Sequence, residues 1–286
     1  MRIATVLLVL LPALVPGQVG HRTLLWQVTR PGMADTTHLF GTMHTRDARA
    51  FQFGPEVAQA FIASEVVAGE LDMEGTKKLD AAVMDAMFLP KGMTLDRLYR
   101  KREYKEVIGV LKERLGPVAP LCVRIRPFYT VAMLSEAELG SDSAVVLDAW
   151  FQAKAQEAGK QVVGLETVTE QIEAVESIPL KEQAGMLLQA VREDDRNGMN
   201  QALEAYLARD LDALMVEVRS SGMPEVADRV LLQDRNLRMT ERLEKLMRGH
   251  AVFVAVGAAH LPGEYGLIER LRRLGYTVLP VLPAQE

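Results

Sequence analysis

The segment "VFVAVGAAHLPG", residues 252–263, joins the most strand-like run of the chain to a glycine and, three positions later, to His260. An unbroken apolar run of this length is typical of a strand that is buried on both faces. The segment "HLFGTMHT", residues 38–45, repeats the pattern, with a glycine followed three positions later by His44. Ligands of open α/β sheets bind beyond the carboxyl ends of strands, so both histidines follow strands at the kind of place where a site forms.

Chance alone does not account well for two such placements. With 21 glycines and five histidines in 286 residues, about 0.4 Gly-x-x-His spacings are expected at random. Histidine supplies a metal ligand or a general base near neutral pH. We therefore predict a site shared by His44 and His260, with the alternative that each imidazole only caps its own loop through a backbone hydrogen bond.

Outward from these two segments, strands and helices alternate, which favours an α/β fold. We predict one domain over residues 22–286, with a central mixed sheet, flanking helices and a helical insertion at about 76–158. Strands are expected at 23–30 and 37–42 as a hairpin, then at 66–72, 161–166, 251–257 and 276–282. Helices are expected at 55–65, 76–88, 94–115, 127–139, 143–158, through 167–218, and at 225–248 and 264–275.

Composition restricts the class of protein. Apolar residues make up 49% of the chain and charged residues 25%, with a net charge of −5, as in ordinary soluble globular proteins. No long basic run occurs and only 6% of residues are aromatic, so we expect no nucleic-acid partner. The single cysteine, Cys122, cannot form an internal disulfide and is expected in the core.

The N-terminal segment "MRIATVLLVLLPALVPGQVG" has the order basic, apolar, small that is typical of a secretory signal. Its apolar run, Ile3–Val15, is shorter than the roughly 20 residues that a transmembrane helix needs. We predict a signal peptide over residues 1–17 and a periplasmic or secreted protein, with membrane contact only through this segment if it stays uncleaved. A buried first strand or a short anchor is the alternative.

Two further strands deliver carboxylates. Glu70 follows the strand in "VVAGELD", and Glu166 follows the strand in "VVGLETVTEQ". Such an acid either joins a site or bonds the amides of a following helix, and for Glu166 the segment "TVTEQ" resembles a helix start. Two imidazoles and one carboxylate form a facial ligand set with open positions for water, and manganese, cobalt or zinc would each fit it. A metal held in this way lowers the pKa of its water and polarises a carbonyl.

The segment "LLQDRNLRMTERL", residues 231–243, adds Arg235 and Asn236 near the start of a long helix. The arginine could hold a substrate carboxylate or an oxyanion, and the asparagine could donate a hydrogen bond. An exposed helix turn in which Arg235 pairs with Asp234 or Glu241 is the alternative. The methionines in helical stretches are attributed to core packing, with a substrate groove as the alternative.

Taken together, "LFGTMH" at 39–44 and "VAVGAAHLPGEYGLIERLRRLGYTVLPV" at 254–281 resemble the TraB/PrgY/GumN family, which includes the animal Tiki proteins. The resemblance covers roughly residues 22–282 and includes "ELD" at 70–72, "GLETVTEQI" at 164–172 and "DRN" at 234–236. It implies a fold similar to those of the erythromycin esterases and a haem-binding lipoprotein family. It also implies a divalent-metal-dependent protease, with His44, His260 and Glu70 as the metal site.

The resulting hypothesis is an exported, metal-dependent hydrolase that acts on a peptide or small protein. His44, His260 and Glu70 would ligate the metal, with Glu70 or Glu166 activating the water and Arg235 and Asn236 contacting substrate. Two rivals remain open. One is a binding protein that captures a peptide or haem without turnover. The other is a metal-free, esterase-like hydrolase in which His44 acts as general base.

Overall fold

The computed structural model describes residues 22–33, 35–75, 81–138, 142–143, 145–192, 195–220 and 222–283. The predicted signal peptide, residues 1–17, lies outside the described residues, so export stays a prediction. Within the described ranges, no helix combines the length and the apolar character that are needed to cross a membrane.

The described residues form a mixed sheet of six strands, at the positions where strands are predicted. The strands are β1 Leu25–Thr29, β2 Thr37–Thr42, β3 Val66–Gly69, β4 Gln161–Gly164, β5 Val252–Gly257 and β6 Thr277–Pro280. Their order is β4-β3-β5-β2-β1-β6, with β4, β3, β5 and β2 parallel. β1 pairs antiparallel with β2, as the predicted hairpin requires, and with β6.

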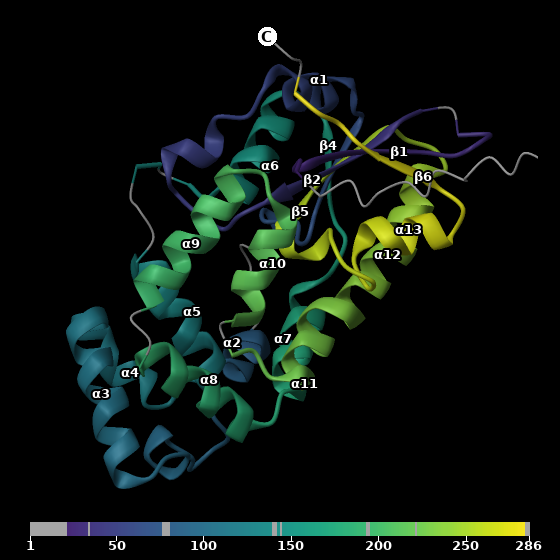
Figure 1. Cartoon of the computed structure of the whole chain (residues 1–286). Coiled ribbons are helices and arrows are strands. Elements are labelled where there is room, and N and C mark those ends of the chain that lie inside the picture. Colours follow the sequence, from purple (N-terminus) through teal and green to yellow (C-terminus); the bar gives the residue numbers. More distant parts are fainter. Residues whose placement is uncertain are drawn as a thin grey trace, which may run out of the picture.

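Helices flank this sheet, which confirms the predicted α/β class (Figure 1). The α-helices in the described residues are α1 Pro55–Ala63, α2 Ala81–Ala86, α3 Lys101–Leu115, α4 Ala119–Cys122, α5 Pro127–Glu138, α6 Leu147–Glu157, α7 Val168–Ser177, α8 Leu180–Arg192, α9 Asp195–Leu207, α10 Leu211–Ser220, α11 Glu225–Asp228, α12 Asp234–Met247 and α13 Leu267–Arg273.

The apolar run of β5 explains its central place. Val252, Phe253 and Val254 are fully buried, as expected for a strand with neighbours on both sides and helices on both faces. Phe151 of α6 packs against Phe253 and against Phe40 of β2, with ring centroids 5.2 Å apart in each case. These contacts join α6, β2 and β5 in one core.

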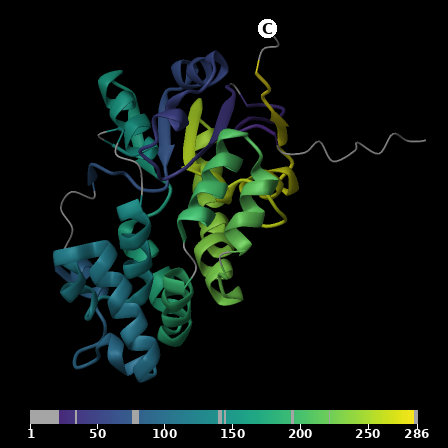
Figure 2. The ribbon, with the colours of Figure 1, turned by 60° about the vertical axis from the view of Figure 1, so that its left-hand side comes forward.

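A second apolar cluster lies at the end of the molecule away from the sheet, among α3, α4, α5 and α8 (Figures 1 and 2). Its fully buried members include Leu95, Val107, Leu111 and Leu187. The predicted helical insertion, about 76–158, supplies most of this cluster. Two helices differ from that prediction. α6 lies inside the range but packs on the sheet, and α8 lies outside the range but joins the cluster. The bounds of the helical insertion therefore stay a prediction.

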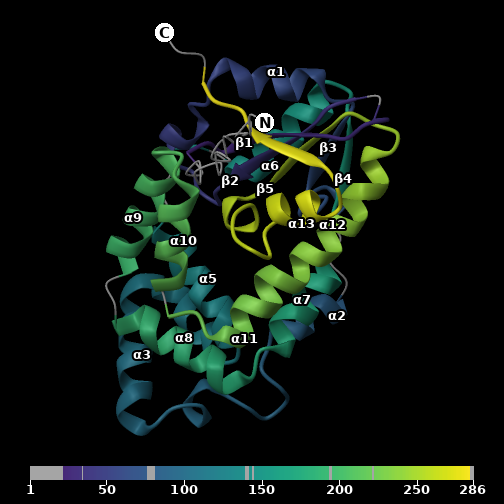
Figure 3. The same ribbon diagram turned by 45° about the vertical axis from the view of Figure 1, so that its right-hand side comes forward.

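α12 connects the two ends of the molecule, as Figure 3 shows. The predicted single helix at 225–248 is divided into α11, a π-helical turn at Arg229–Gln233 and α12. Such π-helical turns are rare and occur often at functional sites. Here the turn ends directly before the segment that carries Arg235 and Asn236.

Candidate active site

Four parallel strands bring the predicted site residues to one edge of the sheet. Thr42 at the end of β2 is in register with Gly257 at the end of β5, and Gly69 of β3 is in register with Ala255 of β5 and with Gly164 of β4. The loops that follow these strands carry His44, His260, Glu70 and Glu166. The carboxyl-edge placement predicted for all four residues is therefore present.

The motif glycines permit close approach between these loops. A Cβ added at Gly257 would lie 3.1 Å from Oε1 of Glu70. A Cβ added at Gly41 would lie 3.0 Å from the Cβ of Ala258 and 3.1 Å from its Cα, in the short 3-10 turn Ala258–His260. Each glycine thus lets a neighbouring segment pack against the strand end, as expected where backbone and site approach closely.

Glu70 is held as a carboxylate. Its Oε2 accepts from Nη2 of Arg235 at 2.6 Å, and its Oε1 accepts from the backbone N–H of Gly257 at 2.9 Å. Burial alone raises the pKa of Glu70, but His260, the Arg235 guanidinium and the Gly257 N–H outweigh it and lower the pKa to about 2. Glu70 is therefore ionised at neutral pH and available as a ligand or a base.

His260 is buried, with 4% of its surface exposed, and its orientation is set by Asn236. The Nδ2 of Asn236 donates to the carbonyl oxygen of Tyr265 at 2.9 Å, which leaves its Oδ1 to accept from Nδ1 of His260 at 2.7 Å. The proton of a neutral imidazole then sits on Nδ1, and Nε2 carries a lone pair. This Nε2 lies 3.6 Å from Oε1 of Glu70.

The surroundings of His260 favour its neutral form. Burial lowers the pKa of His260 below its ordinary value, and the charge of Arg235 lowers this pKa further. The charge of Glu70 raises the pKa but does not outweigh burial. Two acceptor atoms, the Nε2 lone pair and a carboxylate oxygen of Glu70, thus face each other at the strand ends. A cation or a proton donor between them would satisfy both.

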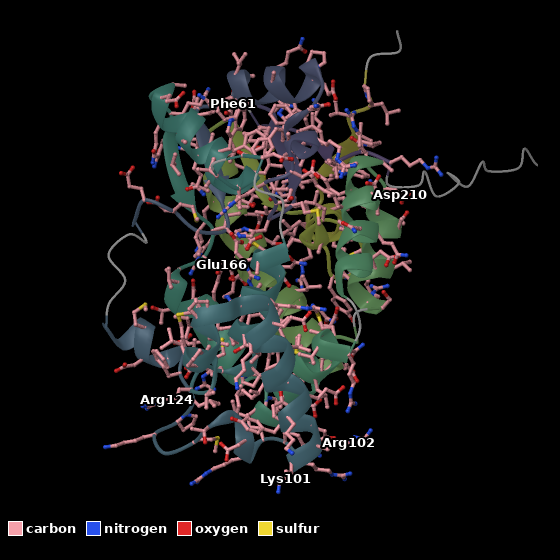
Figure 4. All side chains as sticks on the ribbon, turned by 90° about the vertical axis from the view of Figure 1, so that its left-hand side faces the viewer. Phe61, Lys101, Arg102, Arg124, Glu166 and Asp210 are labelled. Atoms are coloured by element: carbon pink, nitrogen blue, oxygen red, sulfur yellow. The ribbon has the colours of Figure 1, made fainter. Side chains whose placement is uncertain are left out.

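Glu166 bonds Arg235, which in turn bonds Glu70. Glu166 is 3% exposed, and its Oε2 accepts from Nε of Arg235 at 2.8 Å while its Oε1 accepts from Nη2 of Arg238 at 3.2 Å. Arg235 is thereby shared between Glu70 and Glu166, and its Nη1 donates to the carbonyl oxygen of Leu231 at 3.2 Å. Figure 4 shows Glu166 between the part of the molecule that carries Phe61 and the part that carries Arg102 and Arg124.

These contacts redefine two predicted roles. Arg235 and Asn236 act on Glu70 and His260, as positioning residues, and their predicted contact with substrate stays a prediction. Both oxygens of Glu166 already accept from arginines, which suits it to hold Arg235 more than to activate water. The helix-start alternative for Glu166 also differs from the structure, because Thr167 and Glu170 form the capping box of α7.

His44 lies apart from His260. Its side chain is 65% exposed, with Nε2 3.4 Å from Oε2 of Glu136 and Nδ1 3.9 Å from Oδ2 of Asp148. It lines, together with Glu70 and Asp148, a cavity of about 270 Å³. Across the described ranges, no group of three or more His, Cys, Asp or Glu side chains is close enough to hold a metal ion.

The donor types around this cavity nevertheless suit a divalent cation. Imidazole nitrogen and carboxylate oxygen are the ligands that manganese, cobalt and zinc accept. His44, Glu70 and Asp148 line the cavity, and Nε2 of His260 lies 3.6 Å from Oε1 of Glu70. The residues fit such an ion in chemistry, whereas the arrangement of His44 differs from a closed three-ligand set.

Sequence reasoning missed Asp148, Gln152 and Gln171. Thr42 donates its hydroxyl to Oδ1 of Asp148. Burial raises the pKa of Asp148 and the charge of Glu70 adds to this, so the two carboxyls that line the cavity have opposite shifts. Asp148 lies in the first turn of α6, where an acid is expected for its effect on the helix dipole alone. Its position in the sequence therefore gives no sign of a role in the site.

The two glutamines shape the cavity. Nε2 of Gln171 lies 3.4 Å from both Oε2 of Glu70 and Oε2 of Glu166. Gln152 is buried and bridges the loop after β3, donating to the carbonyl oxygen of Leu71 at 2.7 Å and accepting from the N–H of Met73 at 2.9 Å. Gln152 lies in no motif of the sequence, whereas Gln171 lies within the quoted segment "GLETVTEQI", where Glu166 alone was singled out.

Comparisons with known proteins identify the family and several relatives of this chain. The model of the TraB/PrgY/gumN family matches residues 24–280. The chain is similar to the metalloprotease TIKI2 of Danio rerio, 24% identical over 91% of this chain and 61% of that protein. It is also similar to the metalloprotease TIKI homolog of Nematostella vectensis, 24% identical over 94% of this chain and 69% of that protein.

A third relative is the metalloprotease TIKI1 of Homo sapiens, 25% identical over 93% of this chain and 63% of that protein. The chain thus spans 61–69% of the length of these three relatives. The family model covers all six strands of the sheet, from β1 to β6, and both Gly-x-x-His segments. The chain belongs to the TraB/PrgY/gumN family.

Proposed function

We propose that the protein is a metal-dependent peptidase that acts on a peptide or small protein outside the cytoplasm. The observation that carries this proposal is the neutral His260, whose Nε2 lone pair faces the ionised Glu70 at 3.6 Å at the carboxyl edge of the sheet. The metalloprotease names of the relatives support the same reaction class.

His260, Glu70 and His44 are the residues that would hold the ion, which we propose to be manganese, cobalt or zinc. Such an ion lowers the pKa of a bound water and polarises a peptide carbonyl. Asp148 lies beside His44 on the cavity and adds a further carboxylate.

The chain's own residues prepare these ligands. Asn236 keeps the proton of His260 on Nδ1, and the Gly257 N–H and Arg235 keep Glu70 ionised and fixed. Glu166, held by Arg238, keeps Arg235 in place. Mutation of supporting partners of this kind typically lowers metal affinity or activity by about 10- to 100-fold.

Metal content of purified protein tests the proposal, with His44→Ala and His260→Ala beside the parent. The matched control is His250→Ala, because His250 is exposed, pairs with Glu65 and precedes β5 at the opposite edge of the sheet. We expect stoichiometric manganese, cobalt or zinc in the parent and control, loss in both other variants, and peptide cleavage that a chelator abolishes. A parent that takes up none of the three metals contradicts the proposal.

The second candidate is the metal-free hydrolase with His44 as base. It is favoured by the position of His44, which lies on the cavity between Glu136 and Asp148 and away from His260. It predicts hydrolysis that survives chelation and is lost in His44→Ala. The binding-protein hypothesis instead predicts a ligand, peptide or haem, that is retained through purification without turnover.

Export is proposed from residues 1–17. N-terminal sequencing of the protein recovered from cells tests it. Cleavage near residue 17 is the expected result, and an intact Met1 on the soluble protein contradicts a cleaved signal peptide.

A further inference from the structure

A large apolar cavity adjoins the candidate active site. It has a volume of about 820 Å³, within the range of roughly 300–1,000 Å³ that ligand pockets occupy. The walls come from the loops after β2 and α2 and from α3 to α5. We call it the Met-lined cavity, after lining residues that include Met43, Met87, Leu115, Val118, Ile125 and Met133.

The Met-lined cavity shares a wall residue with the site cavity. His44 lines both this cavity and the 270 Å³ cavity that contains Glu70 and Asp148. A third cavity, of about 300 Å³, shares Met87 and Tyr129 with the Met-lined cavity. It also contains Arg235 and shares Gln171 with the site cavity, so the three cavities adjoin one another in pairs.

Two features indicate a ligand in this place. The hydroxyl of Tyr129 is buried, has no hydrogen-bond partner among the described residues, and belongs to a side chain that lines both apolar cavities. Buried polar groups are normally bonded, so this hydroxyl calls for a partner. Val118 on the wall is 42% exposed, so apolar surface is left open there.

The lining of the Met-lined cavity indicates the kind of group that it takes. Apart from His44, Arg114 and Glu136, its lining is mostly apolar, and Glu136 is paired with Arg46. The flexible thioethers of Met43, Met87 and Met133 adapt to apolar groups of different shape.

We infer that the Met-lined cavity is the specificity pocket for a bulky apolar side chain of the peptide substrate, next to the bond that is cleaved. This inference rests on the proposed function. A polar centre flanked by apolar cavities matches an extended peptide whose scissile bond lies at Glu70 and whose apolar side chain enters beside His44.

Ala132→Trp tests the pocket by filling it. Ala132 lines the Met-lined cavity from α5 and is exposed, so a larger side chain is accommodated without disturbing the core. The matched control is Ala58→Trp, since Ala58 is also an exposed helical alanine, on α1, outside the three cavities.

Digestion of a peptide mixture, read by mass spectrometry, gives the preference beside the cleaved bond. We expect leucine, methionine or phenylalanine there, favoured over alanine by about tenfold or more in kcat/KM, because one methylene in an apolar pocket changes kcat/KM about 10- to 200-fold. Ala132→Trp should lose that preference, whereas Ala58→Trp should keep it. Met87→Ala, which enlarges the cavity, should shift the preference toward tryptophan.

Fluorescence titration with Nile red, a neutral apolar probe, separates the two proposals. Saturable binding that weakens about tenfold in Ala132→Trp only, without any peptide cleavage, overturns the peptidase and leaves the pocket as an apolar binding site. Cleavage with no apolar preference, or equal effects of both tryptophan variants, overturns this inference and leaves the proposed function standing.

Discussion

At the scale of single residues, the site depends on which atoms of His260 and Glu70 are left free. Asn236 is fixed by the Tyr265 carbonyl, so its oxygen faces Nδ1 of His260. The Gly257 N–H and Arg235 each donate a hydrogen bond to Glu70, which stays ionised. The outcome is a lone pair and a carboxylate on opposite sides of a short gap, which is what a cation site needs.

Asn236→Ala should weaken metal binding by about 10- to 100-fold, because the imidazole loses the partner that sets its tautomer. The free energy of unfolding should also fall by about 1–3 kcal/mol, since a buried Nδ1 is left without a partner. Calorimetric metal titration and urea unfolding measure the two effects. Asn200→Ala, on an exposed position of α9, is the control and should change neither.

Glu70→Gln should alter how stability depends on pH. The pKa of Glu70 is about 2 in the folded protein, against an ordinary value of 4.5. Ionised Glu70 therefore stabilises the fold above about pH 4.5, and this contribution is lost as pH falls through about 2. The parent should therefore exceed Glu70→Gln in unfolding free energy by a margin that shrinks across that window. A margin that stays constant between pH 5 and pH 2 would show that the carboxylate is not stabilised by its neighbours.

At the scale of elements, the two Gly-x-x-His turns place their histidines differently. After β5 the turn folds back, and Ala258 packs over Gly41 of the neighbouring strand, which carries His260 into a buried position. After β2 the chain continues outward and leaves His44 exposed beside α5 and α6. Identical spacing therefore gives one buried and one exposed imidazole.

Gly41→Ala should destabilise the protein by about 1–3 kcal/mol, because its Cβ would meet the backbone of the turn at Ala258. Gly109→Ala, in the interior of α3, should have the opposite sign and stabilise by about 0.5–1 kcal/mol, since nothing lies within 4 Å of the added Cβ. Thermal or urea unfolding of both variants checks the pair. Equal signs would contradict the packing of the turn on β2.

At the scale of the whole molecule, the candidate site lies between a sheet and a helical end with its own apolar cluster. Both contribute to the surroundings of His44, because β2 carries it while Glu136 of α5 contacts it. The Met-lined cavity lies where the helical end meets the loop after β2. We therefore propose that the helices select the substrate and that residues at the strand ends cleave the bond.

Leu111→Ala tests that division. Leu111 is fully buried in the cluster of the helical end, and its truncation should cost about 2–5 kcal/mol. Metal affinity should stay within about twofold of the parent, because His260 and Glu70 are held by the sheet and α12. Urea unfolding and metal titration provide the readouts, and a large loss of metal affinity would mean that the helical end also holds the ligands.

The sequence by itself determined the strands, the four strand ends and the residues that follow them, because apolar runs and turn residues are local signals. It also singled out the segment that carries Arg235 and Asn236. Only the tertiary structure decided that these two residues position Glu70 and His260, that His44 lies with Asp148 and Glu136, and that apolar cavities flank the site. Those relations depend on strand order and on packing between distant segments, and neither is encoded in the spacing along a single segment.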